Sequence, residues 1–211
     1  MCRSRNRVKK FKAQRHRTKI TVGASFVLLL TAALLFDAGG VIASITLAAA
    51  LHEAAHFAAL RAFGAPVRSF CLTLFGADIR LEPWESLSYA QEILAAAAGP
   101  AANIALAISA SCLGAYFFAG VNLVLGIFNL FPLRQLDGGR VLYLALSALI
   151  DPVFADRAAH VCTLVCGAAL ICALGAYFAF GGEGLAAFIP LAWLLWAEAQ
   201  EVGIVKTPRT V

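Results

Sequence analysis

The sequence predicts an all-α multi-pass membrane protein, with about six transmembrane helices and a small interfacial β-hairpin. Of the 211 residues, 61% are hydrophobic and the mean hydropathy is +0.81, whereas soluble domains are about 45–50% apolar. A helix needs about 20 apolar residues to cross a hydrocarbon layer of roughly 30 Å. The chain therefore has room for several spans, and a large soluble domain is excluded.

Residues 1–19 carry nine Lys or Arg and no acidic residue. This composition predicts a basic cytosolic arm that lies against anionic lipid headgroups. A nucleic-acid-binding arm has a similar composition, but an apolar run follows at once, which favours the lipid bilayer as the partner and leaves no nucleic acid expected. We expect that run, 20–36, to be a retained anchor because it is long for a signal-peptide core and lacks a clear cleavage site.

Six apolar segments follow one another along 20–204, which we expect to form one membrane domain. If the basic arm is cytosolic, the connections at 37–40, 119–120 and 181–184 face outside, and none of them contains Lys or Arg. The positive-inside rule then places both termini, including the short tail 205–211, in the cytosol. The segments are 20–36, 41–60, 90–119, 121–150 with an interruption, 158–180 and 185–204.

The connection at 66–83, PVRSFCLTLFGADIRLEP, differs from the spans. Gly76 lies near its middle, and apolar and charged residues alternate in the ADIRLE that follows. Alternation of this kind is the period of a strand with one wet face. We expect a β-hairpin here, at the cytosolic interface.

The stretch AALHEAAHFAAL at 49–60 places ionisable groups inside the second span. On a helix, His52 and His56 differ by about 40° and one turn, so both imidazoles reach one point. Glu53 lies where a carboxylate can take a proton from a metal-bound water, which is the pattern of zinc hydrolases. The alternative is that a buried His and Glu only form hydrogen bonds between helices, but ionisable groups within a span usually mark function.

A catalytic zinc needs a third protein ligand. His16 and His160 are candidates, and Asp137 is the outstanding carboxylate. Pro132 before it and the two glycines after it predict that the fourth span is broken in the middle, where irregular backbone is tolerated if it lines protein or a wet cavity. Asp137 can then turn toward the second span; the alternative is a cytosolic loop with an exposed Asp.

These motifs resemble the site-2 protease family (peptidase family M50) of intramembrane zinc metalloproteases, and most of all its compact sporulation-type branch (stage IV sporulation protein FB-like). HEAAH at 52–56, AAGPAAN at 97–103 and NLFPLRQLDGGR at 129–140 occur in the family's order. The resemblance implies one catalytic Zn²⁺ held by His52, His56 and Asp137. It also implies Glu53 as general base and Asn129 as a polar group that stabilises the oxyanion.

Three further residues, Gly99, Pro100 and Asn103, match the Gly-Pro motif of the family. Small residues around Pro100 permit close helix packing beside the site. For Gly99 and Pro100, packing alone is an interpretation at least as good as a chemical role.

The function implied is hydrolysis of peptide bonds in membrane-embedded or membrane-associated protein substrates near the cytosolic face. One alternative is a metal-ion transporter, although transport does not require Glu53. Another is a catalytically silent zinc-binding partner, against which an intact Glu53 argues. The PDZ domain of another family branch and the CBS domain of many sporulation-type members are not expected in this sequence, so any regulation falls to a membrane partner or to the cleavage state of the substrate.

Overall fold

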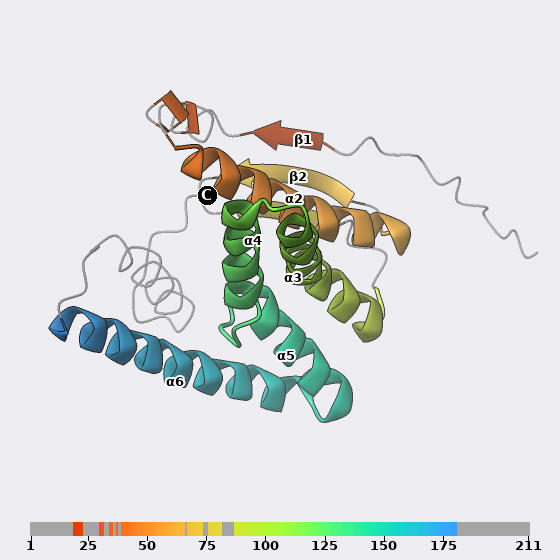
Figure 1. Cartoon of the computed structure of the whole chain (residues 1–211). Helices are drawn as coiled ribbons and strands as arrows, with labels where there is room; N and C mark the ends of the chain where they lie inside the picture. Colours follow the sequence, from red (N-terminus) through yellow and green to blue (C-terminus); the bar gives the residue numbers. More distant parts are fainter. Residues whose placement is uncertain are drawn as a thin grey trace, which may run out of the picture.

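The computed structural model describes residues 19–22, 30–31, 34–35, 37, 39–65, 67–73, 76–81 and 87–180. Helix α3 packs against α2, α4 and α5, and α6 packs against α5; Figure 1 shows α6 extending away from the other helices along one side of the molecule. The helices are α2 (Val41–Ala62), α3 (Tyr89–Cys112), α4 (Tyr116–Asn129), α5 (Asp137–Leu149) and α6 (Pro152–Ala179).

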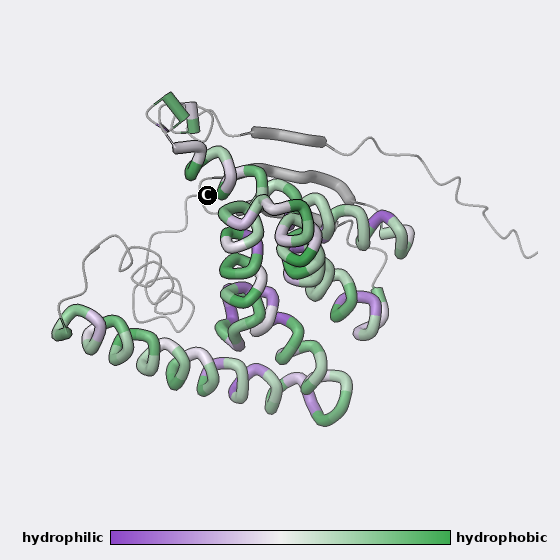
Figure 2. The backbone as a smooth tube through the Cα atoms, in the orientation of Figure 1, coloured by the Kyte–Doolittle hydropathy of each residue, from purple (hydrophilic) through white to green (hydrophobic). Residues whose placement is uncertain are grey.

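Apolar side chains cover most faces of these helices. Figure 2 shows mainly hydrophobic residues along α2, α3, α4 and α6, which is the pattern of helices surrounded by lipid or by other helices. Within the described part of the chain, α2, α3 and α6 are long and apolar enough to cross a membrane, and α4 is apolar but shorter. Three such helices support a membrane protein, whereas the predicted number of six spans stays a prediction.

Polar caps define where several helices begin. The Asp37 carboxylate accepts a hydrogen bond from the Ala43 N–H at 2.8 Å near the start of α2, and this bond lowers the pKa of Asp37 below its usual value. Ser88 and Gln91 form a reciprocal capping box at α3. Asp151 accepts the N–H groups at the start of α6, so each cap satisfies amides that have no helical partner.

The boundary between the third and fourth predicted spans lies earlier than predicted. We expected the connection at 119–120, but α3 ends at Cys112 and α4 already begins at Tyr116. Gly114 has φ +77°, the left-handed conformation that often ends a helix. Gly120, which lies in the predicted connection, is within α4.

The predicted break in the fourth span is present. Helix α4 ends at Asn129 and α5 begins at Asp137. The connection between them is attached to α6 by two interactions of Arg134. The main-chain N–H of Arg134 donates to Thr163 Oγ1 at 3.0 Å, and the Arg134 guanidinium forms an ion pair with Asp156 at 2.8 Å. Asp137 is therefore the first residue of α5, and the connection that leads into α5 is held by contacts with α6.

Three strands form one sheet, with the order β1-β2-β3. Strands β2 (Val67–Thr73) and β3 (Gly76–Leu81) pair antiparallel within the segment where a hairpin was predicted. Strand β1 (Lys19–Val22) pairs parallel with β2 and lies beside it in Figure 1. The location of this sheet at a membrane interface stays a prediction.

Strand β1 changes the start of the first predicted span. Residues 20–22 belong to a strand, so the segment at 20–36 does not begin as a helix. The pairing with β2 was not visible in the local pattern, because it joins residues about 50 positions apart. Most of 23–36 and all of the predicted span 185–204 lie outside the described residues, as do 1–18 and the tail 205–211.

Candidate metal centre

Two imidazoles from α2 meet inside the molecule. His52 and His56 are 5% and 9% exposed, respectively. Their ring centroids lie 4.7 Å apart, edge to face, and their Nε2 atoms are 3.1 Å apart. The spacing of four residues thus brings both ring nitrogens to one point, as helical geometry requires.

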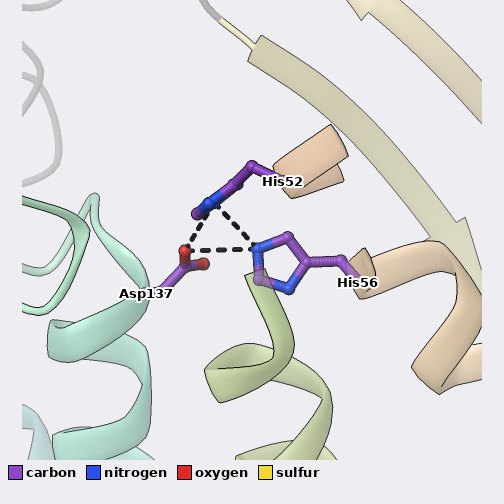
Figure 3. A group of neighbouring side chains, drawn as sticks. All are labelled: His52, His56 and Asp137. Carbon is purple, nitrogen blue, oxygen red and sulfur yellow. Dashed lines mark hydrogen bonds and ion pairs between the residues drawn. The ribbon is translucent and has the colours of Figure 1, made fainter. Parts of the chain in front are cut away.

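Asp137 approaches the two histidines from the start of α5. Its Oδ2 atom lies 3.0 Å from His52 Nε2 and 3.2 Å from His56 Nε2, so the three atoms form a nearly equilateral triangle (Figure 3). The glycines after it keep the backbone compact: a Cβ at Gly138 would lie 2.1 Å from the Leu130 carbonyl oxygen, and one at Gly139 equally close to that of Leu133. The tight turn that delivers Asp137 therefore requires both glycines.

The other ring nitrogens are engaged by hydrogen-bond acceptors. His52 Nδ1 donates to Asn103 Oδ1 at 2.5 Å, and His56 Nδ1 donates to the Ala95 carbonyl at 2.7 Å. A neutral imidazole carries one proton, so these bonds leave the lone pair on Nε2 in both rings. Two lone pairs and a carboxylate oxygen thus face one another.

Such an arrangement fits a cation. Hydrogen-bonded Nδ1 groups are the usual support of metal-ligating histidines. Tetrahedral zinc with bonds of about 2.0–2.1 Å places neighbouring ligands about 3.3–3.4 Å apart. The distances in this cluster, 3.0 to 3.2 Å, are slightly shorter, so a small expansion would admit the ion. His52, His56 and Asp137 could therefore hold a metal ion.

His160, which the sequence offered as an alternative third ligand, lies outside the cluster of His52, His56 and Asp137. His160 on α6 contacts the Arg134 guanidinium and lies 3.8 Å from Asp156, to which it is related by one helical turn. These contacts place it in the group that ties the α4–α5 connection to α6. His16 lies outside the described residues.

Comparison with known families decides where the chain belongs. Residues 40–118 and 114–174 match "Peptidase family M50". This chain is a member of peptidase family M50. The match covers α2 to α5 and most of α6, so it includes every residue of the cluster.

Individual M50 relatives agree with this assignment. The chain is 34% identical over 188 residues to Rip3 of Mycobacterium tuberculosis, named as a zinc metalloprotease, covering 79% of this chain and 46% of Rip3. It is 37% identical over 87 residues to the regulator of sigma E protease of Haemophilus influenzae, covering 41% of this chain and 18% of that protein. The chain therefore spans about half the length of Rip3. The narrower resemblance to the sporulation-type branch stays a prediction.

The fold is also that of a solved structure. The site-2 protease from Methanocaldococcus jannaschii superposes with a TM-score of 0.62 over 92% of this chain and 96% of that one, at 18% identity. At this identity the likeness concerns the fold. Together with the apolar helices, it indicates that this M50 chain is an integral membrane protein.

Two other predicted site residues of the M50 motifs have less defined roles. Glu53 follows His52 on α2 and is partly buried. Asn129 ends α4, and its side-chain amide donates to the Leu125 carbonyl one turn earlier at 3.0 Å. In this arrangement the amide is used within α4, so a role in oxyanion binding stays a prediction.

The motif at 97–103 contributes more to the cluster around His52 than we predicted. Asn103 is completely buried and is the acceptor for His52 Nδ1. The sequence interpretation grouped Asn103 with a motif whose role was open and did not predict this bond. The available signal was an Asn in the middle of an apolar span, since polar groups at membrane depth need a partner.

Proposed function

We propose that this chain is an intramembrane zinc metalloendopeptidase of the site-2 type, with His52, His56 and Asp137 as the ligands of one catalytic zinc ion. The observation that carries the proposal is the convergence of two Nε2 lone pairs and a carboxylate oxygen in a buried site between apolar helices. A protein whose site is built in this way can hold a divalent cation with one coordination position left for water or substrate. Membership of peptidase family M50 supports peptide hydrolysis as the reaction.

The reaction is the attack of a water oxygen on the scissile carbonyl carbon, followed by cleavage of the C–N bond. When bound, zinc polarises the carbonyl and acidifies the attacking water. Glu53 takes a proton from that water and delivers it to the leaving amide nitrogen. Asn129 donates a hydrogen bond to the developing oxyanion, for which its amide exchanges the Leu125 carbonyl for the substrate oxygen.

The proposed substrates are membrane-embedded or membrane-associated proteins, cut near the cytosolic face. Both termini are cytosolic in this proposal, which the concentration of Lys and Arg on one side of the predicted spans supports. A helical substrate hides its carbonyl groups, so the cleaved segment has to be extended first. The sheet β1-β2-β3 offers edges to which an extended segment could add.

Replacing Glu53 by Gln tests the mechanism, because the amide keeps the shape of the side chain but cannot accept the proton. Glu53→Gln should abolish cleavage, read out as accumulation of uncut membrane proteins in a comparison of membrane proteomes, and should leave the zinc content unchanged. Glu92→Gln, the same change near the start of α3, is the matched control. Survival of cleavage in Glu53→Gln would reject the mechanism, and an effect on zinc flux alone would favour a transporter.

A further inference from the structure

Two asparagines are completely buried in adjacent apolar helices. Asn103 on α3 and Asn122 on α4 both have an exposure of 0%. A buried amide in an apolar helix is costly unless all its polar atoms are satisfied. Asn122 belongs to none of the motifs that carry the metal centre, so its burial requires another explanation.

A hydrogen-bond chain of fixed direction passes through Asn122. The Phe118 carbonyl oxygen can only accept, and Asn122 Nδ2 donates to it at 2.9 Å. This bond leaves Asn122 Oδ1 facing α3, where it accepts from Asn103 Nδ2 at 2.9 Å. The Ala48 carbonyl on α2 is a second acceptor for the same Nδ2, at 3.4 Å.

The direction of this chain reaches the metal centre. With Asn103 Nδ2 turned toward two acceptors, Asn103 Oδ1 must face His52 Nδ1. Because Oδ1 only accepts, His52 Nδ1 carries the proton and His52 Nε2 keeps the lone pair that faces His56 and Asp137. Each step follows from the donors and acceptors available, beginning at a backbone carbonyl that cannot rotate.

We propose that Asn122 is a positioning residue of the metal centre: it sets the orientation of the Asn103 amide and thereby the tautomer and ring orientation of His52. The inference rests on the proposed function, since it assigns the consequence to zinc binding. Without Asn122, the Asn103 amide loses its nearer acceptor and is free to rotate by 180°. In that orientation Nδ2 meets the His52 Nδ1–H, which places the proton on the wrong nitrogen or turns the ring.

The test compares two substitutions of Asn122 that separate orientation from packing. Asn122→Leu has similar volume but no acceptor, whereas Asn122→Asp keeps one: an ionised carboxylate accepts from Asn103, and a protonated one also donates to Phe118, as the native amide does. We expect zinc affinity to fall about tenfold in Asn122→Leu and to stay near wild type in Asn122→Asp. The measurement is competition with a zinc-binding dye, using the purified full chain in detergent.

The stability of the zinc-free protein should not follow the zinc affinity of the two variants. A leucine side chain is compatible with an apolar helix, whereas burying a carboxyl group is costly, so Asn122→Leu should unfold no more easily than Asn122→Asp. A purely structural role of Asn122 predicts instead that affinity and stability fall together. Val124→Leu, on the exposed face of the same helix, is the control and should bind zinc as the wild type does.

Equal zinc affinity in Asn122→Leu and the wild type would overturn the inference, as would equal losses in the Leu and Asp variants. A wild type that binds no zinc would overturn the proposed function and this inference together, and is recognised before any variant is made. If Asn122→Leu does not fold, Asn122→Ala, which also lacks the acceptor, replaces it with the same expected loss.

Discussion

Gly99 on α3 faces the imidazole of His56 so closely that a Cβ at this position would lie 2.3 Å from His56 Nε2. The same Cβ would lie 2.7 Å from His52 Cε1. Real Cβ atoms do not approach other atoms this closely, so a hydrogen atom is the largest substituent that position 99 admits while both rings keep their places. The glycine of the Gly-Pro motif therefore leaves space for the imidazoles of His52 and His56.

Gly99→Ala should accordingly displace the imidazoles and weaken zinc binding. We expect a loss of about tenfold or more in affinity, with a destabilisation of about 1–3 kcal/mol from overpacking. Gly120→Ala is a suitable control, because a Cβ there would meet nothing within 4 Å. Zinc titration and thermal unfolding of both variants check this, and normal zinc binding by Gly99→Ala would contradict the close approach.

Asp137→Ala should lower the zinc content of the purified protein. Asp137 Oδ2 lies 3.0 and 3.2 Å from the two histidine nitrogens. Removing it leaves two neutral ligands without the negative charge that balances the charge of the cation. Metal analysis after gel filtration measures the stoichiometry. Asp151→Asn, in which an amide can still cap α6, should retain full zinc; unchanged stoichiometry in Asp137→Ala would reject Asp137 as the third ligand.

Thr163→Val should loosen the connection that carries Asp137. Thr163 is 4% exposed, and its hydroxyl accepts the main-chain N–H of Arg134 while donating to the Ala159 carbonyl. Valine has nearly the same shape but leaves that N–H without its acceptor, at a cost of about 1–3 kcal/mol. Denaturant unfolding in detergent measures the change in the free energy of unfolding, and zinc titration shows whether the zinc affinity also changes.

Thr163→Ser provides the matched control, since serine keeps the hydroxyl and loses only a methyl group. It should stay close to the wild type in zinc affinity. If Thr163→Ser loses affinity while Thr163→Val keeps it, packing of the methyl group and not the bond to Arg134 holds the connection.

Local residue patterns were sufficient to predict several features of the structure. The spacing of His52 and His56 predicts that their rings meet, because the period of a helix does not depend on what surrounds it. Pro132 with the glycines after Asp137 predicted the interruption between α4 and α5, because these residues change the backbone wherever they occur. The apolar composition likewise predicted membrane helices at 41–60 and 90–119, although the second ends earlier.

Other features depended on contacts between distant parts of the chain. Nothing local distinguishes the turn at Gly114 from the glycine at 120, and the pairing of β1 with β2 joins two separate segments. The bonds of Asn103 to His52 and Asn122 likewise require three helices to be packed before any of them can form.

Composition and local spacing were therefore enough to predict the membrane class, the candidate ligand types and the pairing of the two histidines along one helix. Helix packing brings Asp137 to these histidines, leaves room for their rings at Gly99 and assembles the buried amides that orient His52. The two sets of features differ in the distance along the chain over which they act. Propensity and periodicity act within a few residues of the chain, whereas a metal centre is assembled by the packing of helices far apart along it.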